Sequence, residues 1–441
     1  MNADGAPARR GVDAAAIALV LLIPTLLFAD VLFGGKRLYD RDITAYHYPM
    51  KSMVRRAMLS GEFPYWNPLF AGGQPLAANP AYELFYPPQW LILLPDYDLG
   101  FRLSIVIHFY IAALGMYLLL RSIALTPLSA SFGSITFTLS GLLSSLTNLL
   151  PYLSSVAWMP LIVLFVLRFL RTKSSRDFAL AALFLSMQVL CGEPMTLFQT
   201  EVLVLVIGLS QAREARAGAA ATLRSVVSCL AIILAASLTG AAQLLPMIDH
   251  AGDSVRSLGF SFDSATGWST PLIRVFEFVF PHWMGSVADG GAHYWGASYY
   301  QPATSAFIAS FYVGLLAFAL AVGGIICRSR GWSLTVGVFG GSLLLAAGRN
   351  TPVYRLLFHL PFFSATRYPE KYLIAGVFVL IVFASTVLDR LVTGDAAMAR
   401  TLRIVTLALA AISALALMVS FLPKYEPWFK LLWQIPESAR I

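Results

Sequence analysis

The stretch GGKRLYDRDITAYHYPMK, Gly34–Lys51, lies between two strongly apolar segments and carries far more charge than either of them. It opens a region, residues 34–100, that is rich in Pro, Gly, Asn and aromatic residues, a composition typical of turns and short helices. A membrane-spanning helix needs about 20 mostly apolar residues. We therefore interpret this region as a long loop at a membrane surface, between a first apolar helix and all later ones.

The composition of the whole chain indicates a membrane protein. Of its 441 residues, 58% are hydrophobic and 12% are charged, whereas soluble domains carry about 25% charged residues. The net charge of +8 does not indicate nucleic-acid binding, because basic residues of membrane proteins gather in cytoplasmic loops. Cys191, Cys229 and Cys327 lie in or beside apolar segments. Cysteine usually behaves there as a small hydrophobic residue, so we predict neither a disulfide framework nor a zinc site.

Apolar runs along the chain predict about eleven transmembrane helices. These lie near residues 12–33, 101–120, 130–150, 152–170, 178–192, 196–210, 223–245, 304–327, 332–347, 372–388 and 404–422. We therefore expect an all-α polytopic membrane protein, built as a single integral membrane domain over residues 1–441.

Basic residues predict how the helices are oriented. They cluster after the fourth, sixth, eighth and tenth helices, on the same side as Arg9 and Arg10, which precede the first helix. The positive-inside rule then places the N-terminus in the cytoplasm and the long loops, residues 34–100 and 246–303, on the extracytoplasmic side. The first apolar run is long for a signal-peptide core and no small-residue cleavage site follows it, so we expect a retained anchor.

Two smaller elements have distinctive patterns. Residues 50–58 alternate apolar and basic positions at helical spacing, with Lys51, Arg55 and Arg56 opposite the apolar face. We expect an amphipathic helix that lies in the membrane interface with its basic face toward headgroups. The alternative is that this helix packs against the helical bundle. The fifth and sixth helices are short and are separated by CGEP, residues 191–194, which predicts a helical hairpin.

Five motifs stand out along the chain. They are DITAYHYP (42–49), PYWNPLFAGGQPLAANPAYELFYPP (64–88), GEPM (192–195), FPHWMG (280–285) and RYPEKY (367–372). In these motifs the chain resembles the bacterial YfhO-type membrane proteins, which are similar to the wider GT-C class of glycosyltransferases. The resemblance implies a GT-C-like fold and an enzyme that takes a sugar from a polyprenyl-phosphate carrier on the outer leaflet. The sugar would pass to a polymer, a lipid or a protein of the cell envelope.

Such a transfer needs a base to accept the proton of the acceptor hydroxyl, and a carboxylate can serve. Asp42 is the first candidate, because it matches the acidic position that follows the first helix in the resembling family, and Asp40 is the second. The two could share the task or hold a divalent metal ion. The alternative is a solvated turn in which Asp40 pairs with Arg37 or Arg41.

Glu193, in the hairpin motif, is the third catalytic candidate. It has no basic neighbour in sequence, and an ionisable group at membrane depth suggests a function. It could orient the acceptor or help to bind a cation. The alternative is a polar hairpin tip exposed to water.

A phosphate leaving group needs positive charge nearby. Arg367 and Lys371, just before the tenth helix, are the candidates for binding the donor phosphate, mainly because the resembling family has a similar R-x-P pattern. Arg349 is a further candidate on the same face. The alternative is that these side chains snorkel toward bulk headgroups.

The second long loop supplies candidates for contact with the acceptor or the sugar. They are His282, Trp283, His293, Trp295 and Tyr299. Aromatic rings suit a carbohydrate because sugar faces stack on them, but any interfacial loop also carries them. His282 and His293 are too scattered to predict a zinc site, which needs a defined ligand set.

The sequence thus favours a glycosyltransferase of the bacterial plasma membrane, with a lipid-linked sugar donor, membrane lipid and an envelope acceptor as partners. A lipid or glycan transporter, or flippase, is an alternative. A transporter should carry ionisable groups at mid-membrane and an inverted repeat, whereas the charge here lies in loops and no convincing repeat is found. A non-catalytic scaffold of envelope polymer assembly is another alternative.

Overall fold

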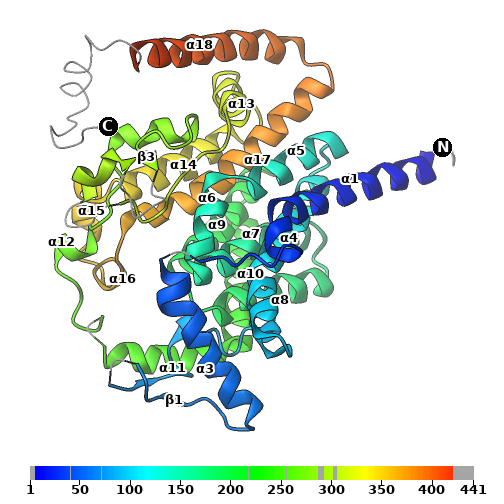
Figure 1. Ribbon diagram of the computed structural model, residues 1–441. Coiled ribbons are helices and arrows are strands. Elements are labelled where there is room, and N and C mark those ends of the chain that lie inside the picture. The colour runs from blue at the N-terminus through cyan, green and yellow to red at the C-terminus, as the bar shows by residue number, and fades with distance from the viewer. Residues whose placement is uncertain are drawn as a thin grey trace. The chain divides into compact units, whose positions relative to one another are not determined.

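The computed structural model describes residues 5–39, 41–70, 72–216, 218–254, 256–286, 293–300 and 305–420 (Figure 1). Nearly all regular structure in these ranges is helical. Two short antiparallel ribbons are the exceptions: β1 (Trp66–Asn67) pairs with β2 (Gln74–Pro75), and β3 (Gly285–Ser286) pairs with β4 (His293–Tyr294). The chain forms two compact units. Unit 1 is Met1–Thr138 with Leu146–Leu258, and unit 2 is Leu139–Ser145 with Gly259–Ile441.

Five of the described helices are long and apolar enough to cross a membrane. They are α4 (Tyr97–Ser122), α7 (Leu150–Thr172), α9 (Pro194–Glu214), α10 (Ala219–Thr239) and the helical segment Pro369–Val392, which comprises η9 (Pro369–Tyr372) and α17 (Leu373–Val392). Shorter apolar helices cover Gly11–Leu27 within α1 (Gly5–Leu27), α13 (Leu315–Ile326) and α14 (Trp332–Ala346). The protein is therefore an all-α membrane protein, and the total of eleven spans stays a prediction.

Unit 1 is built around α4 and α7. α4 packs against α7 and α5 (Pro127–Thr138), α7 also packs against α8 (Ser175–Leu190), and α10 packs against α8 and α9. α4 is buried around most of its circumference, as expected for a helix that is apolar on every side. Polar side chains stabilise both of its ends. Asp96 caps the first turn by accepting from the Leu99 amide, and Arg121 in the last turn pairs with Asp13 of α1.

Unit 2 contains α13, α14, α17 and α18 (Ala396–Ser420). α13 and α14 both pack against α17, and α18 packs against α13 (Figure 1). Gly324 of α13 lets α17 approach closely, because a Cβ there would overlap Val387 and Phe383. Short helices join these long ones: α12 (Phe262–Ala265), η5 (Leu272–Phe278), η7 (Trp295–Tyr300), η8 (Gly348–Asn350), α15 (Pro352–Leu357) and α16 (Pro361–Ala365).

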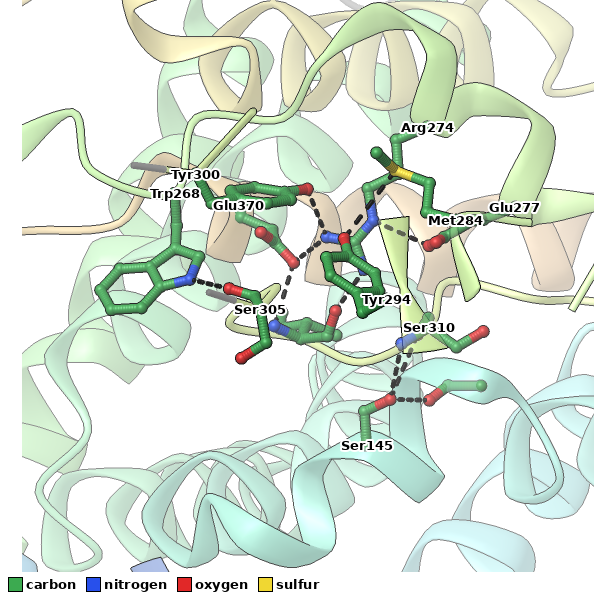
Figure 2. Close-up of polar contacts among 12 residues, drawn as sticks. Ser145, Trp268, Arg274, Glu277, Met284, Tyr294, Tyr300, Ser305, Ser310 and Glu370 are labelled. Atoms are coloured by element: carbon green, nitrogen blue, oxygen red, sulfur yellow. Dashed lines mark hydrogen bonds and ion pairs between the residues drawn. The ribbon is translucent and has the colours of Figure 1, made fainter. Parts of the chain in front are cut away.

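The predicted helix 223–245 is divided at Gly240 into α10 and α11 (Ala241–Gly252). Two other predicted helices have the wrong extent, and one pairing explains both. The predicted helix 130–150 is interrupted: α5 ends at Thr138, α6 covers Gly141–Ser145 and η4 covers Leu146–Asn148. The predicted helix 304–327 begins only at Leu315. The amide of Gly141 donates to the Tyr312 carbonyl at 2.7 Å. Ser145 Oγ accepts from the Ser310 amide at 2.9 Å (Figure 2). These bonds hold residues 310–312 outside any helix, which hydropathy alone does not reveal.

The amphipathic helix of the first loop exists as α3 (Tyr48–Leu59), but it packs on the protein. Met50 and Val54 form a buried cluster with Leu76, Tyr82, Leu84 and Ile92. Arg55 donates to the Leu94 and Pro95 carbonyls at 3.1 Å, and Arg56 is exposed. The expectation that Lys51 lies on an exposed basic face is wrong: Lys51 is fully buried, because it pairs with the buried carboxylate of Glu83.

The turn between α8 and α9 fits closely against the first loop. Gly192 has φ +67°, a left-handed conformation, and a Cβ at this position would overlap the side chain of Pro80 in η2 (Pro80–Tyr82). Only glycine satisfies both constraints. This contact ties the hairpin tip to the loop within unit 1.

We expect Gly192→Ala to destabilise the protein by about 2–5 kcal/mol, combining the left-handed backbone penalty with overpacking against Pro80. Gly61→Ala is the matched control, because Gly61 also has positive φ, +77°, but has nothing within 4 Å of a Cβ. That control should lose only about 1–2 kcal/mol. Thermal unfolding of the detergent-purified variants measures both, and equal losses would show that Pro80 contributes nothing.

Candidate functional site

The amides of the first loop bind one another. Asn67 Nδ2 and Gln74 Nε2 both donate to the hydroxyl of Tyr82 at 2.8 Å, and Asn79 Nδ2 donates to Gln74 Oε1 at 3.2 Å. Asn67 and Tyr82 are almost completely buried. The polar residues of the PYWNP…NPAY motif therefore hold the loop in shape.

Asp42 is exposed and directly precedes η1 (Ile43–His47), a π-helix. Tyr46 lies on that helix, where burial raises its pKa and the charge of Asp42 adds to the effect. Asn79 donates to the Tyr46 hydroxyl at 3.4 Å and caps η2 by accepting from the Ala81 amide at 3.1 Å. η2 begins at Pro80, the residue against which Gly192 packs. A continuous run of contacts thus joins the Asp42 end of the loop to the turn that contains Glu193.

Glu193 is buried, with 3% of its surface exposed. Its carboxylate accepts from the amides of Met195 at 3.1 Å and Thr196 at 2.5 Å, so it caps the N-terminus of α9. The positive end of the helix dipole stabilises a carboxylate there. The alternative of a water-exposed tip is wrong, because Pro80 and the first loop cover the turn. A part in catalysis for Glu193 stays a prediction.

A buried charged cluster beside α3 was not foreseen from the sequence. Lys51 Nζ donates to Glu83 and, at 2.6 Å, to Gln89 Oε1. Burial lowers the pKa of Lys51, and the negative charge of Glu83 opposes that shift. Glu83 adopts the left-handed region, φ +51°, which turns its side chain inward. No signal in the sequence separates Lys51 from Arg55 and Arg56 on the same helix.

Further hydrogen bonds connect the first loop to the long helices α4 and α7. The hydroxyl of Tyr86 lies 2.7 Å from His108 Nε2 of α4 and accepts from Trp158 Nε1 of α7 at 2.7 Å. Tyr86 is completely buried. This links the end of the loop to both central helices of unit 1.

His47, at the end of the π-helix, is 4% exposed, and its Nδ1 has no hydrogen-bond partner among the described residues. Burial lowers its pKa to about 3, with a smaller contribution from the positive charge of Lys51. His47 is therefore neutral at physiological pH.

In unit 2 two of the predicted phosphate-binding residues, Arg367 and Lys371, lie against the ring of Tyr368. The Arg367 guanidinium lies 4.7 Å from the ring centroid of Phe260 and 4.9 Å from that of Tyr368. Lys371 Nζ lies 4.8 Å from the Tyr368 ring and 4.7 Å from the Phe307 ring. Arg367 Nε is buried and has no hydrogen-bond partner among the described residues. We name Arg349, Arg367 and Lys371, with these rings, the cationic site.

Arg349 reaches the cationic site through α12. Its guanidinium donates to the Asp263 carbonyl at 3.0 Å, while two residues further on Ala265 accepts from the Tyr368 amide at 3.0 Å. Its guanidinium also lies 4.0 Å from the Asp263 carboxylate, and the Arg349 side chain is 41% exposed. Arg349 and Tyr368, the residue next to Arg367, thus both contact α12, and a joint role for the three cations stays a prediction.

The nearest carboxylate in sequence, Glu370, faces away into a buried network (Figure 2). Arg274 pairs there with Glu370 and, at 2.7 Å, with Glu277. The Tyr300 hydroxyl accepts from Arg274 at 3.1 Å, and the Ile308 amide donates to Glu370 at 3.0 Å. Glu370 thus pairs with Arg274 and the Ile308 amide in this buried network, and it shares the Arg274 charge with Glu277.

The residues predicted to contact the acceptor are only partly described. His282 is exposed at a positive φ of +56°, and Trp283 is half-buried beside Phe276 and Phe280, with ring centroids at 5.2 and 5.7 Å. Tyr299 is half-buried, and burial raises its pKa. The side chains of His293 and Trp295, and all of Asp40, lie outside the described residues.

Within the described part of the chain, no group of three or more His, Cys, Asp or Glu side chains could hold a metal ion. Since Asp40 is not included, a divalent ion shared by Asp40 and Asp42 stays a prediction.

Comparison of the sequence with known protein families and with curated proteins found no match to either.

We expect Lys51→Met to destabilise the protein by about 3–5 kcal/mol, because it leaves the Glu83 carboxylate buried without its partner. The double variant Lys51→Met/Glu83→Gln should recover much of that loss. Arg56→Met, on the exposed face of the same helix, should change stability by less than about 0.5 kcal/mol. Thermal unfolding measures all three, and a double variant no more stable than Lys51→Met would contradict the pairing.

His47 should make the protein less stable in mild acid. Its folded pKa, about 3, lies below the ordinary value of 6.5, so protonation favours the unfolded state. This stability is complete above pH 6.5 and is lost as the pH falls below it, by about 2 kcal/mol between pH 7 and pH 5. Comparing wild type with His47→Gln at the two pH values isolates the effect. A wild type that loses no more stability than the variant would contradict the burial of a neutral imidazole.

Proposed function

We propose that the protein is an integral membrane glycosyltransferase of the GT-C kind, which moves a sugar from a polyprenyl-phosphate donor to an envelope acceptor. The observation that carries the proposal is the environment of the Arg367 guanidinium. Its guanidinium is stacked near two rings and keeps a buried Nε without a partner among the described residues. An unsatisfied buried donor on a cation is costly unless an anion completes it.

The surroundings of Arg367 suit a phosphate that is attached to a lipid. Lys371 and Arg349 add positive charge, Arg349 lies 4.0 Å from the Asp263 carboxylate, and Glu370 pairs with Arg274. Unit 2 also carries exposed leucines: Leu356 is 74% exposed and Leu360 50%. Apolar side chains beside a cluster of cations suit a ligand with an anionic head and a hydrocarbon chain.

The proposed reaction needs one base and one stabilised leaving group. The acceptor oxygen attacks the anomeric carbon, the bond from that carbon to the phosphate oxygen breaks, and polyprenyl phosphate departs with the electron pair. Asp42 takes the acceptor proton, and Arg367 with Lys371 stabilises the phosphate charge. One displacement inverts the anomeric centre. The exposed carboxylate of Asp42 and the resemblance of its motif support this assignment.

The rest of the proposal follows the sequence. The N-terminus lies in the cytoplasm of a bacterium, the chain crosses the plasma membrane about eleven times, and transfer takes place on the extracytoplasmic side. In this proposal Glu193 fixes the start of α9 against the loop that carries Asp42.

The test follows loss of label from polyprenyl-phosphate hexoses in membranes that contain the protein and envelope extracts. We expect wild type to turn over, Asp42→Asn to be slower by about 10²–10⁴-fold through loss of the base, and Arg367→Gln by about 10²–10³-fold through loss of charge stabilisation. Asp40→Asn, measured alongside, separates the two carboxylates.

Two controls carry the same changes at exposed positions elsewhere: Glu62→Gln in the first loop and Arg400→Gln on α18. Both should retain wild-type turnover. A wild type that is inert with several hexoses and acceptor extracts would refute the transferase, and lipid translocation by the same membranes would then favour the flippase.

A further inference from the structure

The first loop carries a row of exposed apolar side chains that no part of the proposed reaction uses. We name this row the aromatic ridge; its members are Leu59 (57% exposed), Phe63 (48%), Tyr65 (71%), Trp66 (56%), Leu69 (74%) and Phe70 (38%). All lie within twelve consecutive residues at the end of α3 and around β1. Exposed apolar patches of this kind mark contact with a partner or a membrane.

The backbone of the loop fixes the orientation of the aromatic ridge. The alternation along β1 turns Asn67 into the protein and Trp66 outward. The Leu76 amide donates to the Tyr65 carbonyl at 2.8 Å, which fixes the ribbon on both sides of the turn. Gly73 has φ +107°, and a Cβ there would lie 2.6 Å from the Trp66 ring. The backbone at Gly73 therefore supports one side of the indole, while more than half of Trp66 stays exposed.

The polar groups near the ridge do not suit a carbohydrate. A sugar site needs hydrogen-bonding groups beside its aromatic rings, but the nearby amides of Asn67, Gln74 and Asn79 bind Tyr82 and each other. Four ridge side chains have no hydrogen-bonding group for a sugar hydroxyl: Leu59, Phe63, Leu69 and Phe70. Exposed charge at the ridge is limited to Arg56 and Glu62 where α3 ends.

The ridge belongs to a unit whose outer surface already has to meet lipid. α10 is long and apolar enough to span a membrane, yet only 17% of its most apolar stretch is buried within the protein. Its exposed large apolar residues, at helical spacing, are Leu223, Val227, Leu230, Leu234 and Leu238. α11 (Ala241–Gly252) follows and exposes Leu245 and Ile248. Gln243 of α11 donates to the Ala77 carbonyl of the first loop at 3.4 Å, so the apolar surface of α10 and α11 leads to the loop.

We propose that the aromatic ridge rests in the membrane–water interface and that its occupant is the phospholipid of the adjacent leaflet. Trp and Tyr concentrate at that level because their rings are apolar and their N–H and O–H groups reach water, and Phe and Leu bury their side chains below it. The ridge then fixes how deeply the first loop sits, and so sets the height of Asp42 above the hydrocarbon. This lipid contact does not depend on the transferase activity.

Spin labelling of the full chain in phosphatidylcholine–phosphatidylglycerol vesicles tests the contact. A nitroxide at Leu69→Cys should be relaxed efficiently by oxygen, which concentrates in lipid, and poorly by a water-soluble nickel chelate. Leu234→Cys on α10 is the lipid-facing reference, and Glu62→Cys, in the same loop, is the water-facing one. Cys191 and Cys229 are buried, and the wild-type chain treated with the same label gives the background. We expect a ratio of oxygen to nickel accessibility at residue 69 several-fold above that at residue 62.

A ratio at residue 69 equal to that at residue 62 would overturn the proposal, because the ridge would then face water. Low accessibility to both reagents would also overturn it, because another protein surface would cover the ridge. Trp66 gives a second reading: brominated lipids should quench more indole fluorescence in wild type than in Trp66→Phe. These results are independent of hexose turnover, so failure of the lipid contact and failure of the transferase can be told apart.

Discussion

Each of the two long loops is organised around one buried cation that is paired with carboxylates of the same unit. In the first loop Lys51 pairs with Glu83 and Gln89, and in the second Arg274 pairs with Glu277 and Glu370. Neither loop contains a helix long enough to fold by itself, since short helices are marginal in water. A buried charge fixes its partners more strictly than apolar contacts do, because every misplaced arrangement leaves a charge unpaired.

Such pairs contribute more to a specific conformation than to net stability, because removing charges from water costs about as much as their attraction returns. Apolar packing therefore has to supply the stability. In the first loop it comes from Met50, Val54 and the residues around Tyr82. In the second it comes from Ile273, Met284, Tyr294, Tyr300 and Ala306. The charge selects the arrangement, and the surrounding side chains hold it.

Hydropathy predicted the helical class and the approximate places of most helices, because the length and composition of a span follow from the local sequence. It failed where a distant segment decides the conformation. Gly141 bonds to Tyr312, and this pairing ends one predicted helix and delays another. The period of α3 placed Lys51 on its outer face, whereas Glu83 draws that side chain inward. For the candidate site, Arg367 and Lys371 were chosen mainly from the R-x-P pattern and Arg349 from its predicted face. The contacts of Arg367 with Phe260 and of Arg349 with α12 involve segments far apart in the sequence.

The motif RYPEKY contributes both to the buried network of the second loop and to the cationic site. Tyr368 has a left-handed backbone, φ +73°, which is costly for a non-glycine residue and persists only where the surroundings demand it. Its amide bonds to Ala265, and its ring packs edge-on against Trp268 with centroids 4.4 Å apart. The reversal at Tyr368 sends Glu370 into the protein toward Arg274 and leaves Arg367 against the rings. The carboxylate of Glu370 therefore pairs with Arg274 inside the protein. The same short stretch thus supplies an acid to the buried network that orders the second loop and two of the cations of the cationic site.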